Sequence, residues 1–571
     1  MARTISIGCQ NFEIIRTEGY FYIDKTIFIK EWWEGGDSVT LISRPGRFGK
    51  TLTMSMVEQF FSVSYEKSEK LFEELAIWEY DKFRKLQGTY PVLSLSFANV
   101  KERDYSSTIQ RINQIIVDLY HDNGFLRESD ALLPEEKEYL FRISDDMPEV
   151  TATMALHRLA KLLYKHYKKR VIILLDEYDT HMREAYVNGY WEKLTFFTRS
   201  MFNSTFKTNP YLERAIMTGI TRVSRESIFS DLNNLKVVTT TSDEYADCFG
   251  FTEREVFAAL DEFGMTDRRQ EVKRWYDGFT FGSQTDIYNP WSILNYLDTR
   301  RVGTYWANSS SNRLVGKLLR EGSADIKKKF EGLLCGEHLL TPLDEQIVYG
   351  ELDSDETAVW SLLLASGYLK VIRCEEYEDE ALSAGQPNYE LALTNREVLL
   401  MFQNMVRAWF QKGSSYYNDF IKALLKNDLD AMNDYMNHVA LSTFSYFDTG
   451  ERPSRTEPER FYHGFVLGLM VELAGRFEIT SNRERGKYEL CSYGRYDIML
   501  TPKNRERDYA YIIEFKVHKP SKEKDLAQTV ANAHSQIDEK LYDAKLIADG
   551  FSPEQIRKYG FAFKGKECLI G

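Results

Sequence analysis

The tripeptide Gly49-Lys50-Thr51 is the first group of residues whose types and spacing fit a chemical task. In a phosphate loop, backbone N–H groups at a helix N-terminus cradle the phosphates, a lysine reaches the β and γ oxygens, and a Ser or Thr hydroxyl holds Mg²⁺. The segment RPGRFGKT offers these groups, but Arg44 stands where the first glycine of G-x-x-x-x-G-K-[ST] belongs. Alone, the tripeptide fits an ordinary structural turn equally well, so its context decides whether it is a degenerate Walker A loop.

A supporting context comes from Asp176 and Glu177, which directly follow the apolar stretch at residues 171–175. At this place in P-loop NTPases an aspartate holds Mg²⁺, and a glutamate can polarise the attacking water. Without a phosphate loop, the two acids would also fit a buried strand that ends in a solvated acidic turn. Together with the phosphate-loop tripeptide they predict a Walker B motif, in which Asp176 binds the metal and Glu177 is catalytic.

Four polar residues near these motifs are further candidates. Thr218 and Arg222 lie at the end of another strand-like stretch, as in the sensor strand of such ATPases, where a side chain probes the γ-phosphate. Arg44 and Arg47 either compensate through their positive charge for the degenerate geometry of the phosphate loop, or are simply exposed. The residues that we expect to bind the nucleotide are Arg47, Gly49, Lys50, Thr51 and Asp176, with Thr51 and Asp176 as metal ligands.

A second set of charged residues, near the C-terminus, has the composition of a hydrolytic metal site. Phosphodiester hydrolysis requires carboxylates that hold Mg²⁺ and a cation near the charge that develops on the phosphate. Asp497 begins one strand-like stretch, and Glu514 and Lys516 lie two residues apart in the next, hence on one face of a strand. An isolated E-x-K is more often a salt-bridging pair on an exposed edge. If the three converge, all are catalytic, and Asp497 and Glu514 hold the metal.

Neighbouring segments support this site. The strand that carries Glu514 is otherwise apolar, and the following helix carries Gln536. A further acid could come from Glu472, on a helix predicted at 461–477, or equally from Glu484. Basic residues around the site provide a local phosphate-binding surface or are solvated loop charges between acids. They are Arg483, Arg485, Lys487, Arg495, Lys503, Arg505, Arg507, Lys519, Lys522 and Lys524.

The elements that must position these residues follow from the apolar pattern. Continuous apolar stretches at residues 38–42, 90–97, 170–175 and 214–218, separated by helical patterns, predict a parallel sheet with helices on both faces. We therefore expect a multidomain α/β protein, and the length of 571 residues fits several domains of about 150 residues each.

The expected domains are a P-loop domain at 1–250, a helical lid at 251–400, a helical linker at 401–455 and an α/β domain at 456–571. Within the lid, a helix followed by a hairpin pattern at 358–398 predicts a winged-helix-like segment, which could read DNA or contact a protein. The Pro- and charge-rich segment at 450–458 marks the last boundary.

Composition narrows the class of protein. Apolar residues make up 43% and charged residues 28%, which fits packed globular domains. A net charge of -13 excludes binding of polyanions through bulk charge, so contact with nucleic acid needs a local basic surface. No apolar run approaches the roughly 18 residues of a membrane span, and the N-terminus lacks a secretory signal pattern. We therefore expect a cytoplasmic chain without membrane contact. The six scattered cysteines fit reduced thiols.

Longer motifs in the first half of the chain resemble the bacterial AAA-ATPase-like family of P-loop proteins. They are YFYIDKT at 20–26, RPGRFGKT at 44–51, VIILLDEYD at 171–179, TGITRVSRESIFSDLNNL at 218–235, and WYDGFTFG with IYNPWS at 275–292. That family typically carries such an Arg-containing Walker A, so the resemblance implies that Arg44 is a family feature. It also implies that Lys50, Thr51, Asp176 and Glu177 are the nucleotide and Mg²⁺ residues.

Residues 460–545 resemble the PD-(D/E)XK nuclease superfamily domain that is often fused to this ATPase family, through the D…E-x-K arrangement and Gln536. The resemblance implies a restriction-endonuclease-like α/β fold at the C-terminus. The chain departs from the pattern at RGKYELCSY, residues 485–493, which is longer than the usual Gly-rich connection and leaves the place of Glu484 open.

Together, these patterns predict an ATP-binding, Mg²⁺-dependent P-loop protein that controls a C-terminal Mg²⁺-dependent nuclease acting on nucleic acid, with DNA as the expected substrate. The alternative is a non-nucleolytic, nucleotide-dependent switch, or a remodelling ATPase whose nuclease-fold domain only binds nucleic acid or a protein partner. Both candidate sites contain residues of the types that the chemistry requires, which favours enzymatic activity. Resemblance of fold alone does not establish that activity.

Overall fold

The computed structural model of the chain divides into two compact units. The first comprises Met1–Leu318 and Gly336–Leu399, and the second comprises Leu319–Cys335 and Leu400–Gly571. The structure describes residues 2–571 except 222–227, 230–231, 308–312, 335, 344–351, 353–355, 376–387, 411–415, 444–465, 467–469, 471–472, 474–475, 482–496, 506 and 565–566. Within this described part, no helix has the length and apolar character needed to cross a membrane.

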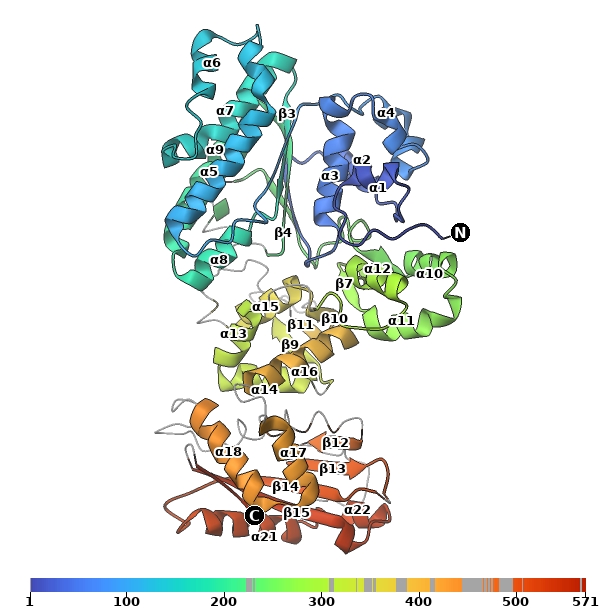
Figure 1. Ribbon diagram of the computed structural model, residues 1–571, viewed down its shortest axis with the longest axis vertical. Helices are drawn as coiled ribbons and strands as arrows, with labels where there is room; N and C mark the ends of the chain where they lie inside the picture. Colours follow the sequence, from blue (N-terminus) through green and yellow to red (C-terminus); the bar gives the residue numbers. More distant parts are fainter. Residues whose placement is uncertain are drawn as a thin grey trace, which may run out of the picture. The chain divides into compact units, whose positions relative to one another are not determined.

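A five-stranded parallel sheet forms the centre of the first unit (Figure 1). Its strands are β1 (Val39–Ser43), β2 (Val92–Ser96), β3 (Val171–Asp176), β4 (Leu212–Gly219) and β5 (Leu235–Val238), in the order β2-β3-β4-β1-β5. All neighbouring strands run parallel, as the apolar stretches predict. The sheet thus brings the carboxyl ends of β1, β4 and β3 side by side. Open parallel sheets bind ligands at this edge.

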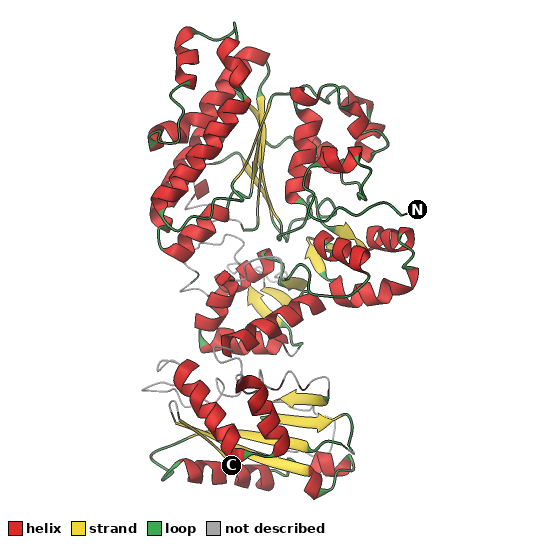
Figure 2. Ribbon diagram, viewed as in Figure 1, coloured by secondary structure: helices red, strands yellow, loops and turns green. Residues whose placement is uncertain are grey.

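Helices cover both faces of this sheet (Figure 2). On one face lie α1 (Phe12–Thr17), α2 (Ile27–Gly35), α3 (Lys50–Phe61) and α4 (Asp81–Arg84); on the other lie α5 (Tyr105–Asp122), α7 (Glu149–Tyr167), α8 (Thr180–Asn188) and α9 (Trp191–Phe206), with α6 (Pro134–Leu140) beside them. Ile172 and Leu174 of β3 join the core under α1–α3. Because side chains alternate along a strand, Ile173 and Leu175 face the opposite helices, and all four are fully buried. Burial on both faces explains the continuous apolar sequence.

Two small antiparallel sheets follow in the first unit. β7 (Phe279–Phe281), β8 (Gln284–Tyr288) and β6 (Phe251–Thr252) pack with α10 (Glu253–Glu262), α11 (Arg269–Tyr276) and α12 (Pro290–Thr299). The turn-rich WYDGFTFG–IYNPWS insert is therefore the β7/β8 hairpin with its flanking helix ends. β9 (Leu339–Pro342), β10 (Leu369–Glu375) and β11 (Asn388–Leu393) form the second sheet, in which β9 precedes helix α15 (Glu356–Ala365) and the β10/β11 pair follows it. The helix and antiparallel pair of the winged-helix-like segment occur in the predicted order.

The second unit contains a mixed sheet with strand order β12-β13-β14-β15-β16. Its strands are β12 (Phe477–Ser481), β13 (Ile498–Pro502), β14 (Ala510–Val517), β15 (Ile556–Lys564) and β16 (Glu567–Ile570). β14 and β15 are parallel, and the other neighbours are antiparallel. One face packs on α17 (Tyr416–Lys426) and α18 (Leu429–Thr443), the other on α21 (Leu526–Glu539) and α22 (Ala544–Ala548). The other α-helices among the described residues of the whole chain are α13 (Arg313–Glu321), α14 (Ala324–Leu334) and α16 (Arg396–Phe410).

Helix α18 also covers the edge strand β16. The Asn433 amide accepts a hydrogen bond from the Ile570 N–H (2.7 Å) and donates to the Ile570 carbonyl (2.9 Å). Asn437, one helical turn later, makes the same pair of bonds with Cys568 (2.8 and 2.7 Å). The two asparagines thus replace a missing neighbour strand, which keeps the edge from pairing with another chain. Helices that the sequence assigns to a linker therefore pack as part of the second unit. The segment at 450–458 lies outside the described residues.

Candidate functional sites

The phosphate-loop segment joins β1 to α3 with a conformation suited to anion binding. Gly49 is the N-cap residue of α3 with φ +84°, and Arg47 also has a left-handed φ of +66°. A Cβ added to Gly46 or Gly49 would enter open space. The loop therefore leaves room beside its backbone at the N-terminus of a three-turn helix, where N–H groups and the helix dipole favour phosphate.

Lys50 lies in the centre of this loop and is 3% exposed. Its ammonium group donates to the carbonyls of Arg44 (2.9 Å) and Pro45 (3.0 Å), and lies 3.7 Å from Glu177 Oε1. The carbonyls of the loop, together with the Glu177 carboxylate, thus stabilise the positive charge of Lys50. An entering phosphate would take over these interactions, because a phosphate oxygen is a stronger partner for an ammonium than a neutral carbonyl.

The hydroxyls of Thr51 and Thr218 converge on Asp176, each from a different element. Thr51 Oγ1 donates to Asp176 Oδ2 (2.8 Å), and Thr218 Oγ1 donates to Asp176 Oδ1. Burial, with the neighbouring charge of Glu177, raises the pKa of Asp176. The structure therefore brings together Lys50, Thr51, Asp176 and Thr218, and the hard oxygen atoms among them are of the kind that Mg²⁺ prefers.

Glu177 follows Asp176 with a left-handed φ of +53°, which turns its side chain out of the strand direction. Its Oε2 accepts a hydrogen bond from Thr180 Oγ1 (3.2 Å) and lies 3.7 Å from the Arg183 guanidinium. Its other oxygen faces Lys50 at 3.7 Å. Glu177 is thus held between two cations, Lys50 and Arg183.

Tyr178 and Asp179 complete the DEYD segment in a way that sequence reasoning missed. Asp179 is fully buried and accepts hydrogen bonds from the N–H (3.0 Å) and hydroxyl (2.8 Å) of Thr221, while the Tyr178 hydroxyl donates to the Thr221 carbonyl (2.7 Å). A Cβ on Gly219 would lie 2.6 Å from the Tyr178 ring. The second half of DEYD therefore fixes the chain after β4. Only knowledge that β3 and β4 are neighbours would have indicated this pairing.

Arg44 corrects an expectation from the sequence, because it is neither exposed nor directed at the phosphate site. It is fully buried, and its guanidinium donates to the carbonyls of Ser43 (3.1 Å), Glu244 (3.1 Å) and Thr239. It also lies 4.5 Å from the centre of the Phe281 ring. Burial lowers its pKa to about 10, so the group stays charged. Arg44 ties the start of the phosphate loop to the segment after β5.

Restoring the standard motif with Arg44→Gly is therefore expected to destabilise the first unit, by about 3 kcal/mol, because three carbonyls lose a charged donor and two of these hydrogen bonds are buried. Urea unfolding of the whole protein measures the shift of the transition. Arg47→Gly is the matched control, because glycine adopts its left-handed φ without strain. An Arg44→Gly variant as stable as Arg47→Gly would contradict this role.

Arg47 lines a cavity of about 890 Å³ next to the loop, within the 300–1,000 Å³ range of ligand pockets. Its guanidinium lies 4.5 Å from the centre of the Trp291 ring. The lining of the cavity also includes Ser6, Gly8, Cys9, Gln10, Leu294, Asp176, Glu177, Thr180 and Arg183. The phosphate loop, the two acids after β3 and the Trp291 ring thus border one cavity.

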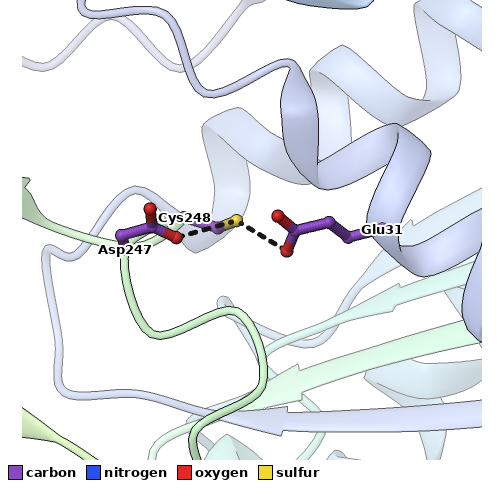
Figure 3. Close-up of side chains that lie close together, drawn as sticks. All are labelled: Glu31, Asp247 and Cys248. Atoms are coloured by element: carbon purple, nitrogen blue, oxygen red, sulfur yellow. Dashed lines mark hydrogen bonds between the residues drawn. The ribbon is translucent and has the colours of Figure 1, made fainter. Parts of the chain in front are cut away.

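The first unit contains two clusters of potential metal ligands. In one the acids accept hydrogen bonds from a thiol, and in the other they surround a lysine ammonium. In Figure 3 the buried Cys248 thiol lies between two acids, 3.5 Å from Glu31 Oε2 and 3.7 Å from Asp247 Oδ1. Burial raises the pKa of this thiol, so it remains a hydrogen-bond donor. The acids Glu253, Asp277 and Asp286 surround the ammonium of Lys273. We assign neither cluster to a metal.

In the second unit, strand register brings the three predicted residues to one face. Ile498 of β13 pairs with Ile513 of β14, so Asp497 lies opposite Glu514. The Phe515 N–H donates to Asp497 Oδ2 (2.8 Å), and the Lys516 ammonium lies 3.3 Å from Glu514 Oε1. Alternation along β14 turns Glu514 and Lys516 toward α21, away from the α17–α18 core.

Gln536 of α21 completes this arrangement. Its amide donates to Glu514 Oε1 and to the Tyr542 hydroxyl (3.1 Å). Glu514 is 2% exposed, and Tyr542 is 3% exposed. Burial, followed by the charges of Glu514 and Asp497, raises the pKa of Tyr542. Tyr542 was missed in the sequence, because it follows the end of the helix and belongs to no recognised spacing.

Several sequence candidates lie outside the described residues. These are Arg222, Glu472, Glu484 and the basic residues Arg483, Arg485, Lys487 and Arg495. The structure therefore does not choose between the two glutamates. Of the basic residues around Glu514, those within the described part are exposed: Lys503, Arg505, Arg507, Lys519, Lys522 and Lys524.

Comparison with known proteins assigns both units. A family model described as "Predicted AAA-ATPase" matches residues 6–229, and one described as "PD-(D/E)XK nuclease superfamily" matches residues 457–571. The chain joins an AAA-ATPase-like domain to a PD-(D/E)XK nuclease superfamily domain. The resemblance drawn from the motifs is thereby confirmed, and so is the α/β class of both domains.

Two individual proteins are similar to this chain. One is an "Uncharacterized protein in vnfD 5'region" of Azotobacter chroococcum mcd 1, which is 23% identical over 90% of this chain and 89% of its own length. The other is a solved structure, the ORC2 protein of Aeropyrum pernix in ADPNP and ADP complexes, with 10% identity and a TM-score of 0.24, covering 67% of this chain and 92% of that one.

Proposed function

We propose that the AAA-ATPase-like domain binds ATP with Mg²⁺ and that its nucleotide state controls Mg²⁺-dependent cleavage of nucleic acid, with DNA as the expected substrate, by the nuclease superfamily domain. The observation that carries the proposal is the convergence of Asp497, Glu514 and Lys516 on one face of the second sheet, next to Gln536. The phosphate loop with Asp176 supports the nucleotide half.

In the nucleotide site, the residues fit a metal-bound triphosphate. The open space beside Gly46 and Gly49 suits phosphate oxygens, and the Thr51 hydroxyl with the Asp176 carboxylate would hold Mg²⁺. The cation neutralises charge on the β- and γ-phosphates when bound. Lys50 would exchange its two loop carbonyls for phosphate oxygens, and Glu177 would orient and deprotonate the attacking water.

In the nuclease site, Asp497 and Glu514 would hold the divalent cation, since hard oxygen ligands from carboxylates suit Mg²⁺. The cation supplies Lewis-acid stabilisation of the phosphate oxygens. Gln536 fixes the orientation of Glu514, and the backbone N–H of Phe515 fixes Asp497. Lys516, 21% exposed, is free to turn from Glu514 toward substrate and stabilise the charge that develops on the phosphate.

The test is cleavage of labelled single- and double-stranded DNA and RNA by the whole protein, with Mg²⁺, Mn²⁺ or EDTA, and with ATP, ADP or no nucleotide. We expect cleavage of at least one substrate that requires the divalent cation and changes with ATP. Binding of ATP without cleavage of any substrate would instead favour the alternative, a nucleotide-dependent switch or remodelling ATPase whose nuclease-fold domain only binds a partner.

A further inference from the structure

The phosphate loop is supported from outside by a buried tryptophan. The carbonyl of Gly46 accepts hydrogen bonds from Trp306 Nε1 (2.8 Å) and from the Asn289 side-chain amide (3.3 Å). Trp306 is 2% exposed and packs on Phe279, with ring centres 5.3 Å apart. The position of the loop backbone is therefore linked directly to the position of Trp306.

The backbone at Trp306 is in turn held by Glu397. Glu397 Oε1 accepts hydrogen bonds from the N–H groups of Trp306 (2.6 Å) and Ala307 (3.3 Å), and Oε2 accepts one from the Ser292 hydroxyl (2.8 Å). Glu397 is 1% exposed and Ser292 is fully buried. A buried carboxylate that accepts three hydrogen bonds fixes all three donors, because each would otherwise be left unsatisfied.

Glu397 lies in the first turn of α16 (Arg396–Phe410), a helix that is continuous across the division between the two units. Asn395 caps this helix, since its side chain accepts from the Val398 N–H (3.1 Å) and its amide donates to the Tyr276 carbonyl (3.2 Å). Further along the helix, in the second unit, Phe402 packs on Phe330 with ring centres 5.0 Å apart. The start of α16 is thus anchored near the nucleotide cavity, and its remainder belongs to the unit that carries the nuclease fold.

Occupancy of the loop would change the contacts of the two residues directly before Gly46. In the structure, the Lys50 ammonium donates to the Arg44 and Pro45 carbonyls. A bound phosphate would compete with these carbonyls for the ammonium. Pro45 cannot shift freely, because it packs so closely on Gly367 that a Cβ there would lie 2.9 Å away. The loop therefore rearranges against fixed neighbours, a condition for passing on a change of state.

We propose that Glu397 is a positioning residue through which occupancy of the phosphate loop reaches α16, the helix that crosses the division between the two units. The proposal rests on nucleotide binding at the loop, as proposed above, and adds the route by which it acts. No contact between the two units is needed, because α16 belongs to both. The site of regulation is the Gly46–Trp306–Glu397 chain of hydrogen bonds.

The test is hydrogen–deuterium exchange of the whole protein with and without saturating Mg²⁺ and a non-hydrolysable ATP analogue, with nucleotide binding measured on the same samples. In the wild type, the analogue is expected to change exchange of peptides from α16 by about fivefold or more, the lower range of allosteric coupling. Glu397→Ala removes all three acceptor contacts and should abolish the response, and Glu397→Gln, which preserves the shape and an acceptor oxygen, should restore it.

Trp306→Phe tests the same route if Glu397→Ala does not fold. This variant keeps Glu397 as the hydrogen-bond acceptor of Ser292 and Ala307. It should also abolish the response of α16, whereas Trp360→Phe, at an equally buried tryptophan on α15, should keep it. A response that persists in Trp306→Phe, or an α16 that does not respond in the wild type although the analogue binds, would overturn the inference alone. Failure of the wild type to bind any nucleotide would overturn both this inference and the proposed function.

Discussion

Replacing Glu514 with alanine is expected to lower phosphodiester cleavage by at least about 10³-fold while ATP binding is unchanged, because the change removes a proposed metal ligand and a preorganised charge from the reacting centre. Glu514 is 2% exposed, and its Oε1 interacts with both Lys516 and Gln536. Loss of the Glu514 carboxylate therefore also removes the shared partner of the Lys516 ammonium and the Gln536 amide. The measurement is the single-turnover cleavage rate over a series of Mg²⁺ concentrations.

Two companion variants separate chemistry from folding in this experiment. Glu514→Gln keeps the size of the side chain but not its charge, so it should fold as the wild type does and be nearly as inactive as the alanine variant. Glu478→Ala, on the exposed side of β12 in the same sheet, should keep wild-type cleavage. A Glu514→Gln variant that cleaves within about tenfold of the wild-type rate would contradict the assignment of Glu514 as a metal ligand.

The parts of the fold that were predicted from sequence are those in which local pattern and burial agree. The strands that carry Asp176 and Glu514 are apolar apart from their functional ends, because both of their faces are buried. Since side chains alternate along a strand, the spacing of Glu514 and Lys516 was enough to place them on one face. The order of strands in the first sheet brings Thr218 next to Asp176. A contact of Thr218 with the γ-phosphate stays a prediction.

The parts that were not predicted depend on contacts between residues far apart in the sequence. Arg44 was expected at the phosphate or in solvent, but carbonyls almost two hundred residues later hold it in the core. Asn433 was in a segment assigned to a linker, although it pairs with the last strand of the chain. Glu397 binds Ser292 and Trp306, and nothing in its local sequence indicates a buried carboxylate. Spacing rules describe one element at a time, so they do not reveal such partners.

Replacing Lys50 with alanine is expected to weaken binding of ATP by at least about 100-fold, because the ammonium is the charged donor that the phosphate-loop motif directs at the β and γ oxygens. The loop itself should stay folded, since Arg44 still ties its start to the segment after β5. Binding of a fluorescent ATP analogue to the whole protein measures the affinity, and Lys67→Ala, at an exposed lysine of the same domain, is the control.

The same variant separates control by nucleotide from cleavage itself. If the nucleotide state governs the nuclease site, Lys50→Ala should cleave at the rate of the nucleotide-free wild type whether or not ATP is added, because Glu514 and its partners lie in the other unit. Cleavage by Lys50→Ala that still changes with ATP would mean that the nucleotide acts elsewhere. Loss of all cleavage in a folded Lys50→Ala protein would instead make nucleotide binding a requirement of the nuclease site, so that the empty loop is an inhibited state rather than a neutral one.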